Sequence, residues 1–128
     1  KKIHDLIPDM PLVMHGASSV PQDLQDIINA HGGAIKPTWG VPIEEIQQGI
    51  KFGVRKVNVD TDLRMAMTGA IRRVFQENPV EFDPRKFLAP SITAMKSVCA
   101  HRYEEFGAAG RGDAIKPRSL ADMAQSYL

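Results

Sequence analysis

The sequence predicts an α/β fold built on parallel strands, and three observations support that prediction. Two short runs rich in β-branched and apolar residues, 11–16 and 54–60, have the composition of strands. Each run is followed by apolar residues at helical spacing, which is the pattern of consecutive βα units. Each run also ends in polar side chains, at the edge where parallel α/β folds place their binding sites.

Helices are expected between and after these strands. They begin near Pro21, at Pro42, at Thr61 or Asp62, at Ser91 and at Ser119. Their ends are expected at Gly32-Gly33, Gly53, Asn78-Pro79 and Gly107. The segment 83–85 is expected in a connector, and the glycine-rich, charged segment 107–118 is expected to be mobile. Residues at core spacing in the helix from Ser91 are Ile92, Met95, Val98, Cys99 and Phe106.

The composition is that of a soluble globular protein and argues against several classes of function. The 128 residues, 43% apolar and 24% charged, fit one domain. No stretch approaches the roughly 18 apolar residues of a membrane span, and the first residues lack the pattern of a signal peptide. The net charge of +1 gives no reason to expect a nucleic acid or a membrane as partner. The single cysteine, Cys99, excludes an internal disulfide and fits a reducing cytoplasm.

The alternation of strand side chains directs polar groups to one face of the second run. Val57 and Val59 share a face, whereas Lys56, Asn58 and Asp60 share the other. A strand between two apolar layers is apolar on both faces, so a face that turns polar toward the C-terminal end indicates a site.

The first run supplies the other half of this candidate site. His15 is its last residue, and an imidazole beside open space suits a zinc ligand, although a structural, hydrogen-bonded histidine is the alternative. The segment 16–19, Gly-Ala-Ser-Ser, can bring backbone N–H groups to a phosphate, or it can be an ordinary βα turn.

The end of the second run offers donors to a substrate. Asn58 can donate to an oxyanion or a hydroxyl, and Thr61 begins a helix whose N–H groups favour an anion. Asp60 suits a substrate hydroxyl better than a phosphate. Helix capping by Asp60, Thr61 or Asp62 is the alternative. Arg85 is either a surface charge or a bidentate phosphate clamp.

Taken together, these motifs resemble the class II fructose-bisphosphate aldolases, which depend on zinc. The matching stretches are LVMHGASSVPQ (12–22), GVPIEEIQQGIKFGVRKVNVDTDLRMA (40–66), FDPRKFL (82–88) and FGAAG (106–110). The 43 positions that separate His15 from Asn58 fit the longer-loop branch, which includes the Calvin-cycle-type enzymes.

The family fold is a TIM (β/α)8 barrel, and the two runs resemble its seventh and eighth strands followed by C-terminal helices. Barrel phosphate sites commonly follow those two strands. A complete barrel needs at least ~200 residues. The resemblance therefore implies that residues 1–128 are the C-terminal part of one aldolase barrel domain, with its upstream strands absent, and that this part alone is inactive.

The resemblance also implies roles for the residues of the first run. His15 matches one of three histidines that bind the catalytic zinc. Gly16, Ala17 and Ser18 match the loop that holds the phosphate of dihydroxyacetone phosphate. Gly16 and Ser18 also match positions near a monovalent-cation site.

A second substrate-binding segment of the family is matched at the end of the second run, by Asn58, Val59, Asp60 and Thr61. In the family the asparagine helps to hold the enediolate, and the threonine end contacts phosphate. Arg85 matches an arginine that reaches into a neighbouring subunit and binds the other phosphate, which implies a homodimer or homotetramer.

The implied reaction is the reversible aldol cleavage of fructose 1,6-bisphosphate to dihydroxyacetone phosphate and glyceraldehyde 3-phosphate through a zinc-stabilised enediolate, as in glycolysis, gluconeogenesis and the Calvin cycle. The other two zinc histidines and the acid/base carboxylate have no match here and are expected upstream. The alternatives are a class II aldolase for tagatose or sedoheptulose bisphosphate, a catalytically silent phosphate-binding barrel, and an aldolase that uses Lys56 as a Schiff base.

Overall fold

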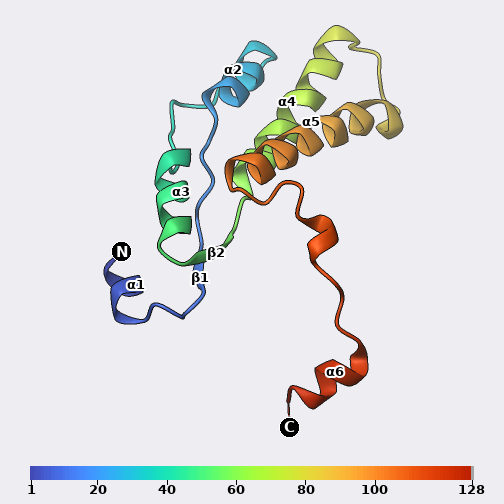
Figure 1. Ribbon diagram of the computed structural model, residues 1–128. Helices are drawn as coiled ribbons and strands as arrows, with labels where there is room; N and C mark the ends of the chain where they lie inside the picture. The colour runs from blue at the N-terminus through green and yellow to red at the C-terminus, as the bar shows by residue number, and fades with distance from the viewer. Residues whose placement is uncertain (128) are drawn as a thin grey trace.

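Two short strands pair in parallel, as the sequence predicts. The computed structural model describes residues 1–127, in which β1 (Leu12–Met14) pairs with β2 (Val54–Val57) (Figure 1). Met14 lies opposite Val57, and the N–H of Asn58 continues the ladder by donating to the Met14 carbonyl at 3.0 Å. The strands are shorter than the predicted runs, so His15 and the segment 58–60 lie just beyond their ends.

Two helices connect the strands, α2 (Gln22–Ala30) and α3 (Ile43–Lys51). Pro21, predicted near a helix start, is the N-cap of α2, and Pro42, predicted at the first helical position, is the N-cap of α3. Each helix buries an isoleucine, Ile28 in α2 and Ile46 in α3. The connection is the helical crossover that parallel strands require.

A long helical hairpin follows β2. It consists of α4 (Thr61–Glu77) and α5 (Pro84–Glu105), and α4 also packs against α2. At Gly69 an added Cβ would lie 2.9 Å from Ile27 Cγ2. A glycine is therefore required for the close approach of α2 and α4. Between these helices lies a small core of Val20, Leu24, Ile28, Ile35 and Met65.

The start of α5 corrects the sequence prediction, which placed a helix cap at Ser91. The helix begins at Pro84, and the N-cap carboxylate of Asp83 accepts from the Arg85 N–H at 2.9 Å. The helix then continues through Pro90, and Ser91 is buried inside it with its hydroxyl donating to the Leu88 carbonyl at 2.7 Å. The segment 83–85, predicted to be a connector, is thus the start of a helix.

The predicted core face of α5 is also only partly correct, because Ile92 and Cys99 are exposed. The remaining elements are short: α1 (Lys2–Leu6), η1 (Gly112–Ala114) and α6 (Leu120–Gln125). The segment after α5 runs away from the hairpin and carries α6 with it (Figure 1). Ser119 caps α6, as predicted. Within residues 1–127, no helix is both long enough and apolar enough to cross a membrane.

Candidate active site

The ends of the two strands bring His15 and Asn58 into direct contact. The Asn58 Nδ2 atom lies 2.6 Å from His15 Nδ1, and Lys56 Nζ donates to Asn58 Oδ1 at 2.8 Å. The Asn58 amide therefore joins the ends of β1 and β2 through its two polar atoms. His15 is exposed and Asn58 is half-buried.

The His15 ring can serve as a metal ligand once its hydrogen bond is rearranged. Ligation through Nδ1 would displace the Asn58 amide. Ligation through Nε2 would place the ring proton on Nδ1 and turn the amide oxygen toward it. Among residues 1–127, no group of three or more His, Cys, Asp or Glu side chains could hold a metal ion. Within the described residues, His15 therefore has no partner ligands with which to form a complete metal site.

A loop with free backbone donors follows β1, and we call it the 16–20 loop. Gly16 has a φ of 62°, the left-handed region that favours glycine. The Ser18 Oγ atom accepts from the N–H groups of Asp60 and Thr61, each at 3.1 Å. Because these two bonds occupy the oxygen, its own hydrogen remains to donate elsewhere.

The 16–20 loop contacts the start of α4 through the Ser18 hydroxyl. In the described part of the chain, the N–H groups of Gly16, Ala17 and Ser18 have no hydrogen-bond acceptor. These groups, the Ser18 hydroxyl and the positive end of a 17-residue helix suit an anion such as phosphate.

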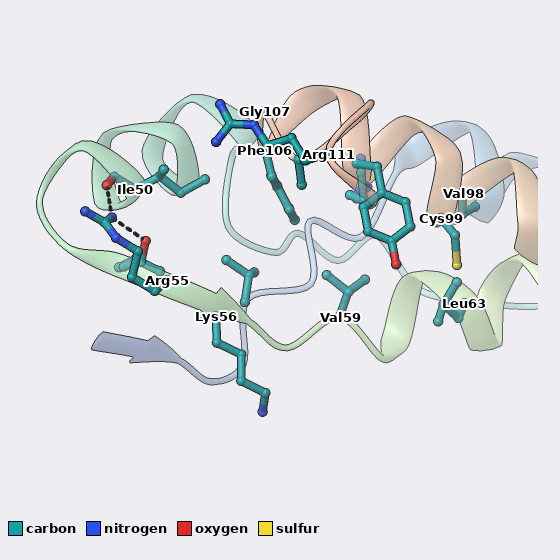
Figure 2. A pocket seen from close by; sticks show the side chains of 15 residues that line it. Ile50, Arg55, Lys56, Val59, Leu63, Val98, Cys99, Phe106, Gly107 and Arg111 are labelled. Atoms are coloured by element: carbon teal, nitrogen blue, oxygen red, sulfur yellow. Dashed lines mark hydrogen bonds between the residues drawn. The ribbon is translucent and has the colours of Figure 1, made fainter. Parts of the chain in front are cut away.

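Residues at the end of β2 and just after it border a second hollow of the chain. Val57 and Val59 line a groove of about 910 Å³ between β2 and the C-terminal half of α5. Lys56 also borders this groove, although the end of its side chain extends away from the groove in Figure 2. The Asp60 carboxylate accepts from Arg64 Nε at 2.8 Å. His15 and Asn58 do not line the groove, so it is separate from the candidate site.

Arg85 lies far from His15 within the chain. It is at the tip of the hairpin, beyond the 17 residues of α4, a length of about 25 Å. Its side chain is 89% exposed and pairs with Asp83, with Nη2 2.6 Å from Oδ2. The hydrogen bonds from Arg85 hold the pKa of the Asp83 carboxyl below its ordinary value. The fold of one chain does not bring Arg85 to the other site residues.

Asp62, Ser19 and Arg102 form a network that the sequence did not predict. By sequence Asp62 is a possible helix cap, yet its side chain is fully buried and pairs with Arg102 at 2.9 Å. The sequence does contain a signal: Arg102 falls between Val98 and Phe106 at helical spacing, which places a charge on the apolar face of α5. A charge in that position requires a buried partner.

Comparisons with known proteins identify the family. Residues 1–111 match the model of the family described as fructose-bisphosphate aldolase class-II. The chain is 61% identical over 127 residues to the fructose-bisphosphate aldolase of Pseudomonas aeruginosa. The aligned region covers 99% of the chain and 36% of that protein.

Two further relatives give the same result. The chain is 61% identical to fructose-bisphosphate aldolase 2 of Cereibacter sphaeroides, over 98% of the chain and 35% of that protein. It is 58% identical to the fructose-bisphosphate aldolase of Nostoc commune, over 99% of the chain and 35% of that protein. The chain thus spans about a third of the length of these curated relatives. With a family model that matches most of its residues, this chain belongs to the class II fructose-bisphosphate aldolases.

Proposed function

We propose that this chain supplies one zinc ligand and the phosphate-binding end of an enzyme that reversibly cleaves fructose 1,6-bisphosphate to dihydroxyacetone phosphate and glyceraldehyde 3-phosphate. The observation that carries the proposal is the contact of His15 with Asn58, 2.6 Å apart at the ends of two parallel strands. The free donors of the 16–20 loop lie beside it. Relatives that carry the name fructose-bisphosphate aldolase support the same reaction.

In this proposal residues 1–128 form the C-terminal part of a single barrel domain. The strands β1 and β2 take the seventh and eighth positions, and the upstream polypeptide supplies the other strands. The enzyme acts as a homodimer or homotetramer in the cytoplasm, in glycolysis, gluconeogenesis or the Calvin cycle. The parallel pairing of β1 and β2, with a helical crossover between them, supports this placement.

His15 holds the metal in this proposal, together with ligands from the upstream part. Zinc, when bound, supplies a Lewis acid for the ketone carbonyl of the substrate. The Asn58 amide donates to the oxygen that gains negative charge in the transition state, and a carboxylate from the upstream part moves the proton.

The 16–20 loop holds the phosphate on the dihydroxyacetone side of the substrate. The N–H groups of Gly16, Ala17 and Ser18 and the Ser18 hydroxyl donate to the phosphate oxygens, with Thr61 at the positive end of α4. Val59 and Asp60 complete this segment, and carbonyl oxygens near Gly16 and Ser18 can take a monovalent cation. Phosphate binding fixes the reacting carbons in register with the metal.

The first test separates metal catalysis from Schiff-base catalysis. In the complete enzyme, a chelator such as EDTA should abolish cleavage and added zinc should restore it, whereas borohydride with substrate should leave activity unchanged. Loss of activity after borohydride would favour Lys56 as a Schiff base. The same assay with tagatose and sedoheptulose bisphosphates discriminates between sugars, and no cleavage of any of them would leave a phosphate-binding barrel without catalytic activity.

The second test concerns Arg85, which we propose binds the other phosphate in the site of a neighbouring subunit. Its exposed guanidinium, oriented by Asp83, lies about a helix length from its own His15. Replacing Arg85 by Ala should raise KM for the bisphosphate about tenfold, because a charge-assisted hydrogen bond is lost. Lys86→Ala, in the same exposed turn, is the matched control. Equal KM values for both variants would show that Arg85 is a surface charge that does not bind the phosphate.

A further inference from the structure

A buried carboxylate lies directly behind the 16–20 loop. The fully buried Asp62 accepts from the Ser19 N–H and the Ser19 hydroxyl, each at 3.2 Å. It also accepts from the Val20 N–H at 2.9 Å. A carboxylate without access to water needs a positive partner to remain charged.

Arg102, in the last turns of α5, is that partner, and it also contacts the loop itself. Its Nη2 atom lies 2.9 Å from Asp62 Oδ2 and 2.5 Å from Ser19 Oγ. The Ser19 hydroxyl thus accepts from Arg102 and donates to Asp62, which closes a triangle of hydrogen bonds. On the other side of the guanidinium, Nη1 donates to Glu105 at 2.5 Å.

The electrostatics of this cluster keep Arg102 charged. Its side chain is only 13% exposed. Burial lowers the pKa of Arg102, and the hydrogen bonds to Asp62 and Glu105 raise it, so that the pKa lies above its ordinary value. The guanidinium therefore remains a fixed positive charge between two carboxylates.

The loop that this cluster holds is strained. Val20 has a φ of 53°, and it is the one residue other than glycine with a positive φ in the described part of the chain. A β-branched residue keeps this conformation only where its surroundings enforce it. Asp62 binds the Val20 N–H directly, and Ser18 is tied to the start of α4 through Asp60 and Thr61.

We propose that Arg102 is a positioning residue for phosphate binding. It holds Asp62 and Ser19, and through them it fixes the conformation in which the N–H groups of Gly16, Ala17 and Ser18 converge on the phosphate. The inference rests on the proposed role of the 16–20 loop in binding phosphate. It makes the end of α5, 83 positions from Ser19, a structural determinant of substrate affinity.

The test measures phosphate binding in the complete enzyme. Arg102→Met keeps the apolar stem and removes the charged hydrogen bonds, so the Kd for inorganic phosphate and KM for the bisphosphate should each rise about tenfold. The zinc content should be unchanged. Arg102→Lys keeps the charge and should recover part of the loss. Arg72→Met is the matched control, because it removes an arginine that donates to the Gly32 carbonyl in a different loop.

The outcomes separate this inference from the proposed function. If the unaltered enzyme binds phosphate and Arg102→Met binds it equally well, the inference is wrong and the aldolase proposal stands. If the unaltered enzyme binds no phosphate, both are wrong. Should Arg102→Met fail to fold, the double variant Asp62→Asn, Arg102→Met removes the unpaired buried charge. That variant should still bind phosphate about tenfold more weakly, and binding at the unaltered level would overturn the inference.

Discussion

Replacing His15 by Ala is expected to remove tight zinc binding from the complete enzyme and to lower turnover at least about a thousandfold. A Lewis acid contributes several kcal/mol of transition-state stabilisation, and each ~1.4 kcal/mol is a factor of ten in rate. His15 is exposed at the end of β1, and its ring has no role in the core. The fold should therefore survive the change. Zinc content and kcat, measured on the same preparation, check this prediction.

The matched control is His101→Ala. His101 is also exposed, and its ring bonds the Ser97 carbonyl of its own helix at 3.0 Å. The control should keep its zinc and its turnover. A His15→Ala enzyme that retains activity without zinc would remove His15 from the mechanism, and one that keeps both zinc and activity would show that the metal is held elsewhere.

Most helix boundaries could be predicted because local chemistry determines them. Pro21 and Pro42 precede α2 and α3, and Gly107, with a φ of 69°, follows α5. The start of α5 was missed for a local reason as well. Asp83 and Pro84 are a complete helix start, whereas Ser91 has the residue type of a cap but lies inside the helix behind Pro90.

In the candidate site, too, one contact could be predicted from the sequence and another could not. The meeting of His15 with Asn58 followed from strand alternation and from parallel strands ending at one edge. The link from Asp62 to Arg102 spans 40 positions and depends on how α4 packs against α5. No local pattern contains that packing, although a charge on the apolar face of α5 indicates that some partner exists.

Replacing Asn58 by Ala is expected to lower kcat by a factor of about 10² to 10³, the usual effect of losing one donor to a developing oxyanion. The Asn58 amide also bonds His15 and Lys56, at 2.6 and 2.8 Å. A small change in zinc affinity is expected from the loss of support for the imidazole. The phosphate donors of the 16–20 loop do not involve this amide, so Kd for inorganic phosphate should be unchanged.

The control for this substitution is Asn29→Ala. Asn29, in the last turn of α2, bonds the backbone of Ile35 through both polar atoms of its amide. The substitution therefore removes two hydrogen bonds, as Asn58→Ala does, but away from the candidate site. It should alter stability without altering kcat. Equal kcat values in the two variants would assign Asn58 a structural role only.

One measurement decides whether two strand tips serve a single substrate: bound zinc and kcat determined together in the Asn58→Ala enzyme. We expect nearly full metal occupancy with turnover reduced by two to three powers of ten, about 10² to 10³. Unchanged turnover would contradict this account. So would metal and turnover lost in equal proportion, because the amide would then act only as a support for His15.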